Sequence, residues 1–325
     1  MPRFALPALF LGLALAVGVV AWQGVGDVAK ALNQAGFGLL WLVPSFLFPL
    51  FLSALAWAVL FPPGSRPALR QLGIASWIAV SINWLLPVAQ IGGEVVRAAW
   101  LARRAEPAAV MAATTIVDKL LQAAAQALVA LIGIALLLPL ASGNDLVPGL
   151  LVFAALLLAL VPLFLYAQKK GVLLRFAASA EGVFLRRAAR ASTLTARLTG
   201  LDSALAETCA APRRLLLYTL LRLLSRLVIA VEVWLALALM GHPIGVLEAV
   251  MLECLVQSLR SAAFAVPGAY GVQEGGFILL GALIGLPAEV ALSVSLAKRL
   301  RELLIGLPGL VYYQVSEGRL ALARR

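Results

Sequence analysis

Long apolar blocks dominate the chain, and short polar connections separate them. The blocks span about residues 4–22, 37–61, 72–86, 108–139, 148–167, 215–239, 245–266, 277–285 and 290–314. Their apolar residues run continuously instead of alternating, and many blocks reach the roughly 20 residues that a helix needs to cross a bilayer. Because lipid offers no partner to free backbone polar groups, this pattern predicts an all-α integral membrane protein.

A Gly-rich break interrupts the pattern in each half of the chain. One break is Pro87–Gly93 and the other is Pro267–Gly276. The neighbouring blocks 72–86 and 277–285 are too short to cross a membrane alone. We therefore predict about six full transmembrane helices and two re-entrant helical hairpins that enter from opposite faces. Such an arrangement suggests an inverted repeat of the kind found in transporters. Eight plain spans with Pro/Gly kinks are the alternative.

Composition and charge support membrane insertion and predict an orientation. Hydrophobic residues make up 63% of the chain and charged residues 13%, whereas about 25% is usual in soluble domains. The surplus of Lys and Arg, which gives a net charge of +11, lies mainly in connections 62–71, 97–106 and 168–214 and in the C-terminal tail. We expect these connections and both termini in the cytoplasm. The positive charge is then directed at anionic lipid and not at nucleic acid.

Residues 1–325 are interpreted as a single polytopic membrane domain. Its only substantial polar region is the basic segment 168–214, in which four leucines share one helical face: Leu194, Leu198, Leu201 and Leu205. This face predicts an interfacial helix on an anionic leaflet. The block 4–22 is longer than the apolar core of a signal peptide, and we interpret it as a retained membrane anchor.

Several ionisable residues lie inside apolar blocks, where each ionised side chain costs about 2.5 kcal/mol or more. Three sets recur at helical spacing or cluster: Asp118, Gln122 and Gln126; Glu253, Gln257 and Arg260; Lys298, Arg299, Arg301 and Glu302. Of these, Arg301 is predicted to lack a local partner. The sets either line a polar cavity or form a purely structural interhelical network.

Arg222 and Arg226 add two cations one helical turn apart. Like charges at this spacing repel, so something anionic is expected near them. For Arg222, snorkelling to the inner interface is an alternative. Each Gly-rich break ends in an acidic residue, Glu94 or Glu274, at the start of a new helix, where free N–H groups attract anions. These glutamates either cap their helices or hold an arginine beside a lipid phosphate.

At these positions the sequence resembles a known membrane family. The matching residues are Asn83, Pro87, Gly92-Gly93-Glu94, Arg97 and Asp118-Lys119 in the first half, and Pro267-Gly268, Gly271-Val272, Glu274, Arg299, Glu302 and Gly309 in the second. The chain is similar to the flippase domain of lysylphosphatidylglycerol synthases and its stand-alone relatives over nearly its whole length. Ala269 departs from the pattern, because a second glycine is usual there. The form also resembles the branch associated with hopanoid biosynthesis.

The resemblance implies lipid translocation in a bacterial inner membrane, because the aminoacyl-transferring domain of the full-length synthases is not encoded in these residues. A polar midplane cavity is expected to bind an anionic or polar headgroup. The expected substrate-binding residues are Gly92, Gly93, Glu94, Arg97, Asp118, Arg226, Arg260, Gly268, Gly271, Glu274, Arg299, Arg301 and Glu302. Removal of charge at Arg299 or Arg301 is expected to abolish transport without unfolding the protein.

Cofactors and catalysis are not expected. The single histidine, His242, lies in a loop sequence beside glycine and proline, and the chain has no nucleotide-binding P-loop motif. The expected partners are membrane lipids, with a homo-oligomer and lipid-biosynthesis proteins as further candidates. Two other functions stay open: a non-transporting subunit of hopanoid or glycolipid biosynthesis, and an intramembrane lipid-modifying enzyme that uses Asp118 or Glu253.

Overall fold

The computed structural model describes residues 33–86, 92–104, 108–139, 191–263 and 269–323, and single positions at 30, 148, 152, 155, 156, 159 and 166. Within these residues the secondary structure is helical, without a β-strand, as predicted. The helices are η1 (Gly36–Trp41), α3 (Leu42–Leu60), α4 (Leu69–Leu85), α5 (Gly92–Ala102), α6 (Ala108–Leu137), α9 (Ala191–Cys209), α10 (Pro212–Val228), α11 (Ala230–Leu239), α12 (Val246–Ala262), α13 (Val272–Ala282) and α14 (Ala288–Ala323).

Parts of some predictions lie outside the described residues. These parts are the apolar block 4–22, nearly all of block 148–167, the first part of the basic segment, residues 87–91 of the first break, and residues 264–268, which include the first two residues of the second break.

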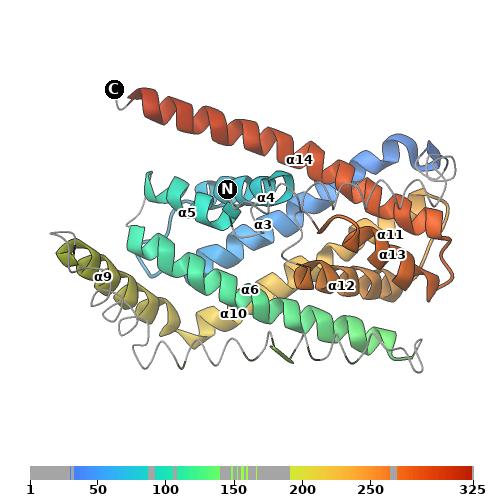
Figure 1. Cartoon of the computed structure of the whole chain (residues 1–325), viewed down its shortest axis with the longest axis horizontal. Helices are drawn as coiled ribbons and strands as arrows, with labels where there is room; N and C mark the ends of the chain where they lie inside the picture. Colours follow the sequence, from blue (N-terminus) through green and yellow to red (C-terminus); the bar gives the residue numbers. More distant parts are fainter. Residues whose placement is uncertain are drawn as a thin grey trace.

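Two sets of three helices have matching lengths and positions. A helix of 17 residues, a break, a helix of 11 residues and a long helix follow each other as α4, α5 and α6, and again as α12, α13 and α14. Helix α13 begins 180 residues after α5 (272 against 92), and α14 begins 180 residues after α6 (288 against 108). The long helices α6 and α14 run in opposite directions in Figure 1. This is the arrangement of an inverted repeat.

Each short helix packs against the longer helix that precedes it, as the helices of a hairpin do. Helix α5 packs against α4, and α13 packs against α12. With 11 residues each, α5 and α13 are about 16 Å long, roughly half the thickness of a bilayer core. Neither can cross a membrane alone, so each must turn back or end inside the protein.

The two halves of the repeat are interlocked. Helix α14 packs against α4 of the first half, α6 packs against α12 of the second half, and α3 packs against α10. A glycine permits the close approach between the halves, because a Cβ on Gly309 of α14 would collide with the hydroxyl of Ser81 in α4. Within the first half, a Cβ on Gly93 of α5 would collide with the carbonyl oxygen of Ala79 in α4.

The outer surface of the bundle is apolar. Several large apolar side chains stand exposed on η1, α3, α10 and α14: Phe37, Trp41, Phe48, Leu216, Leu307 and Val311. Among the described residues, two helices are long and apolar enough to cross a membrane by length and composition, Asn33–Leu60 and Ala108–Leu137. An apolar exterior around a polar interior suits a lipid environment.

Helix α9 brings part of the basic segment 168–214 against the rest of the bundle. Helix α9 packs against α6. Leu205 is fully buried and Leu201 is partly buried, and both join the apolar cluster formed by α3, α4, α5 and α6. At this end the leucine face of α9 is therefore covered by the protein itself. The side chains of Leu194 and Leu198 lie outside the described residues.

Candidate functional site

A first polar network gathers around Asp118 on α6. Asp118 is completely buried and forms an ion pair with Arg97 of α5. Its carboxylate accepts hydrogen bonds from Nε2 of Gln122 (2.8 Å) and from the hydroxyl of Tyr218 on α10 (2.5 Å). The guanidinium of Arg97 lies 3.9 Å from the ring centre of Trp57. Arg97 and Asp118 thus neutralise each other inside the protein.

Glu94 in the first turn of α5 completes this first network. Its Oε1 lies 2.6 Å from Nζ of Lys119 on α6, and its Oε2 accepts a hydrogen bond from Nδ2 of Asn83 on α4 (3.0 Å). The N–H of Gly93 donates to Oδ1 of Asn83 (2.9 Å). Glu94 therefore holds a lysine, where the sequence suggested an arginine, and ties together three helices around the first break.

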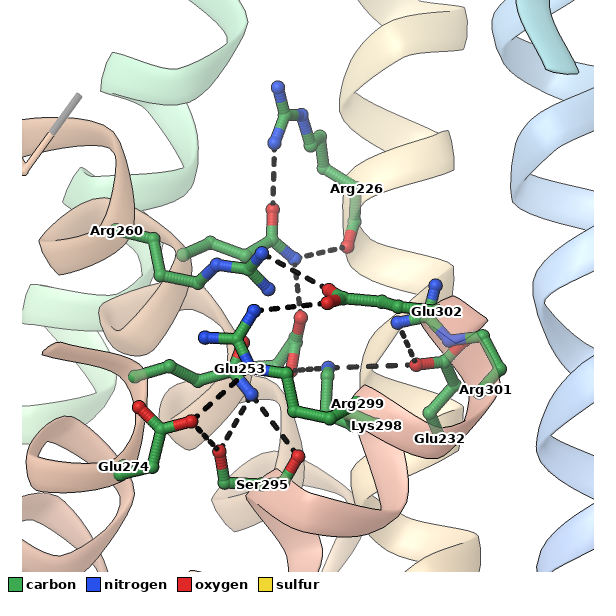
Figure 2. Close-up of polar contacts among 12 residues, drawn as sticks. Arg226, Glu232, Glu253, Arg260, Glu274, Ser295, Lys298, Arg299, Arg301 and Glu302 are labelled. Carbon is green, nitrogen blue, oxygen red and sulfur yellow. Dashed lines mark hydrogen bonds and ion pairs between the residues drawn. The ribbon is translucent and has the colours of Figure 1, made fainter. Parts of the chain in front are cut away.

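A second polar network surrounds α14 (Figure 2). Nζ of Lys298 lies 2.5 Å from Oε2 of Glu253 on α12 and 3.6 Å from Oε2 of Glu232 on α11. Arg301, predicted to lack a local partner, pairs with the same Glu232 oxygen at 3.2 Å. The Arg301 guanidinium also lies 4.1 Å from the ring centre of Phe46. The partner of Arg301 comes from another helix, which helical spacing along α14 cannot reveal.

The remaining members of the second network meet at Glu302. Its carboxylate accepts hydrogen bonds from Arg299 Nη1 (3.0 Å) and from Arg260 Nη2 of α12 (3.1 Å). Nε of Arg299 also donates to Oε1 of Glu274 (3.2 Å), while the N–H of Gly271 donates to Oε2 of Glu274 (2.7 Å). Glu274 thus caps α13 and also holds Arg299.

The two networks occupy equivalent places in the repeat. Glu94 and Glu274 are 180 residues apart, and so are their partners Lys119 and Arg299. In each half, a glutamate in the first turn of the short helix holds a cation on the following long helix. At the positions just before these cations the charge is reversed between the halves: Asp118 and Lys298.

Each network contains equal numbers of carboxylates and ion-paired cations. The first contains two carboxylates and two paired cations: Glu94, Asp118, Arg97 and Lys119. The second contains four carboxylates and four paired cations: Glu232, Glu253, Glu274, Glu302, Arg260, Lys298, Arg299 and Arg301. In the described residues, the interhelical network considered from the sequence therefore exists, and Arg260, Arg299 and Arg301 are already neutralised.

Two arginines on α10 are left over from this pairing. Arg222 Nε donates to the hydroxyl of Tyr218 (3.2 Å), and Arg226 Nη1 donates to Oε1 of Gln257 (3.2 Å). Neither forms an ion pair with a carboxylate of the described residues, and both are partly exposed. Through Tyr218 one arginine touches the first network, and through Gln257 the other touches the second. Two surplus cations one turn apart therefore stand between the two networks.

The predicted site residues are largely brought together, with one outside the described part. Gly92 and Gly93 begin α5, and Gly271 precedes α13 with a φ of 79°, a backbone conformation that favours glycine. Gly268 lies outside the described residues. The candidate set left out six charged or phenolic side chains of the networks or in contact with them: Lys119, Tyr218, Arg222, Glu232, Glu253 and Lys298. The sequence pattern had drawn attention to four of them: Lys119, Arg222, Glu253 and Lys298. No pattern in the sequence drew attention to Tyr218 or Glu232.

The two networks and the two arginines beside them are rich in hydrogen-bond donors. Within the described parts of the chain, no group of three or more His, Cys, Asp or Glu side chains is placed to hold a metal ion. Cys209 and Cys254 are free thiols. What the networks offer is a set of hydrogen-bond donors with a surplus of positive charge, which suits a phosphate or carboxylate guest.

Comparison with known proteins agrees with this picture. Neither a curated protein nor a solved structure gave a significant match to the chain. A family model described as the lysylphosphatidylglycerol synthase TM region matches residues 9–309, which includes every element of both networks. The chain is therefore a membrane protein that belongs to the lysylphosphatidylglycerol synthase transmembrane family.

Proposed function

We propose that this chain translocates lipids across a membrane, and that the phosphate of an anionic or polar headgroup binds between Arg222 and Arg226. The observation that carries the proposal is the pair of surplus arginines between two otherwise neutral networks. Two cations this close repel each other, so an anion between them relieves repulsion as well as forming charge-assisted hydrogen bonds. The acyl chains would stay against the apolar exterior of the bundle.

The inverted repeat supports a transport role. In transporters of this construction, the substrate site lies near the midplane, where broken helices of the two halves meet. Here α10 lies beside both α6 and α12, and its two arginines reach one network from each half. Motion of one half against the other would expose this position to alternate sides. The proposed location is a bacterial inner membrane with both termini in the cytoplasm, an orientation that the distribution of Lys and Arg supports.

Replacement of Arg226 by glutamine tests the proposal directly. Arg226→Gln leaves no buried carboxylate without its partner, so we expect the variant to fold. It should slow translocation of fluorescent phosphatidylglycerol in reconstituted vesicles by about tenfold or more, since a charge-assisted hydrogen bond contributes about 1.5–3 kcal/mol. Arg222→Gln should act in the same direction.

Arg213→Gln is the matched control, because Arg213 is exposed on the same helix and is not part of either network. It should translocate the lipid at the wild-type rate. Wild-type rates in both Arg222→Gln and Arg226→Gln would refute the proposed site. Absence of translocation by the wild-type protein with every anionic, zwitterionic and neutral lipid tested would instead favour a non-transporting role in lipid biosynthesis.

A further inference from the structure

Glu232 is held differently from every other carboxylate of the two networks. Its side chain is completely buried, yet neither oxygen accepts a hydrogen bond from a described residue. Only the ion pairs with Arg301 at 3.2 Å and Lys298 at 3.6 Å compensate its charge. The other carboxylates of the networks each accept at least one hydrogen bond: Glu94, Asp118, Glu253, Glu274 and Glu302.

The surroundings of Glu232 leave its charge weakly compensated. Lys298 lies closer to Glu253, at 2.5 Å, so Glu232 has only a share of that cation. The charged groups facing Glu232 are Lys298, Arg301 and Glu302 from α14 and Glu253 from α12. Helix α3 and η1, which also contact α11, contain no charged residue. A buried carboxylate without hydrogen bonds is the kind of group that readily becomes neutral by taking up a proton.

A continuous chain of polar contacts connects Glu232 with Arg226 (Figure 2). Arg226 donates to Oε1 of Gln257 at 3.2 Å, and Nε2 of Gln257 donates to Oε1 of Glu253 at 2.9 Å. Oε2 of Glu253 accepts a hydrogen bond from Nζ of Lys298, and the same Nζ lies 3.6 Å from Oε2 of Glu232. A negative guest at Arg226 is therefore linked through three side chains to the one weakly held carboxylate.

We propose that Glu232 is a proton-binding site coupled to headgroup binding at Arg222 and Arg226, so that an anionic lipid is carried together with a proton. This inference rests on the proposed function. An anion at the arginines adds negative charge to the second network and favours the neutral form of Glu232. By reciprocity, neutral Glu232 leaves the network more positive and strengthens anion binding.

The chemical step is simple. A proton from the aqueous phase forms an O–H bond with a carboxylate oxygen of Glu232 as the anion binds, and the same bond breaks when the anion leaves. No oxidation or leaving group is involved. The cotransport of one negative charge with one proton is electrically neutral, so a proton gradient could drive the lipid and the membrane potential would not.

Binding of short-chain phosphatidylglycerol to the purified, detergent-solubilised protein tests the coupling. Calorimetry in two buffers of different ionisation enthalpy gives the number of protons taken up per lipid. For the wild-type chain we expect uptake on binding and a dissociation constant that falls by up to about tenfold per pH unit as the pH is lowered. Glu232→Gln should bind at least as tightly at neutral pH, with no uptake.

Further variants protect the test from folding defects. Glu232→Asp keeps an ionisable group and should keep the proton uptake. Glu207→Gln, which removes an exposed acid on α9, should behave as the wild type. Wild-type binding without proton uptake would overturn the inference, and so would full uptake in a folded Glu232→Gln.

The outcome separates this inference from the proposed function. Proton uptake that disappears in Glu232→Gln, in a protein that moves no lipid between leaflets, would support the proton site and refute translocation. Translocation of phosphatidylglycerol without proton uptake and without a response to a pH gradient would support the proposed function and refute the proton site.

Discussion

At the scale of the single residue, charge pairing explains how so many ionisable groups are retained in an apolar bundle. Each buried cation of the two networks meets a carboxylate, and most carboxylates meet more than one donor. Removal of one partner from a buried pair typically costs about 3–5 kcal/mol, because the other charge is left uncompensated. This changes the expectation for Arg299 and Arg301, whose replacement should affect folding as well as transport.

Arg301→Gln is predicted to lower the free energy of unfolding by roughly 3 kcal/mol, because it leaves Glu232 with only its distant contact to Lys298. The double variant Arg301→Gln/Glu232→Gln should recover much of that loss. Thermal unfolding in detergent micelles measures both. Arg226→Gln, the same substitution at an arginine without an ion pair, is the control and should unfold close to the wild type. Equal losses in the single and double variants would contradict the pairing.

Replacement of Ala269 by glycine, unlike Arg301→Gln, is not expected to lower the free energy of unfolding. It is buried with a φ of 49°, a left-handed conformation that costs a non-glycine residue about 1 kcal/mol. Ala269→Gly should therefore be neutral or should raise the free energy of unfolding by up to about 1 kcal/mol, although glycine is generally destabilising. A clear loss of stability in the same unfolding assay would show that the methyl group contributes more by packing.

The sequence predicted single residues unevenly. Helical spacing allows Glu302 to pair with Lys298 or with Arg299, and in the structure it contacts Arg299. Partners from other helices, such as Glu232 for Arg301, depend on how helices are arranged in space and leave no trace in local spacing. For the same reason, the sequence did not reveal that Arg299 and Arg301, which were expected to bind a headgroup, each form an ion pair with a glutamate of another helix.

At the scale of the element, the two hairpins depend on close contact between a short helix and its longer neighbour. Breaks and block lengths were sufficient to predict that these segments exist, because Gly-rich interruptions and short apolar blocks are visible in the sequence. The contact faces were not predictable, since they depend on small residues whose role appears only when helices meet.

Gly93→Ala tests the first hairpin. A Cβ there would overlap the backbone carbonyl of Ala79, which cannot rotate away, so α5 must move from α4 at a cost of about 1–3 kcal/mol. Gly73→Ala is the matched control on α4, where a Cβ meets open space, and it should raise stability by about 0.5–1 kcal/mol. Denaturation midpoints that shift in the same direction for both variants would argue against the close contact.

At the scale of the whole molecule, the interlocked halves must move relative to each other if the chain transports lipid. Ser53 of α3 and Ser225 of α10 belong to different halves, and their hydroxyl oxygens lie 3.0 Å apart. Cysteines at these positions are close enough to form a disulfide.

Ser53→Cys/Ser225→Cys, in a background with Cys209 and Cys254 replaced, should lose translocation on oxidation and regain it on reduction. Vesicle assays before and after treatment with a reductant measure the effect. Each single cysteine variant is the control and should not respond. Full activity of the cross-linked protein would exclude relative motion of α3 and α10 as part of the transport cycle.

The reversed charges at Asp118 and Lys298 have a consequence for directionality. A repeat with identical halves would have no preference between the two sides of the bilayer, because turning it over would reproduce it. In this chain, equivalent positions of the two halves carry opposite charges, Asp118 in the first half and Lys298 in the second. Under the proposed function, the inward- and outward-facing forms of this chain should therefore differ in energy, and lipid should move at different rates in the two directions.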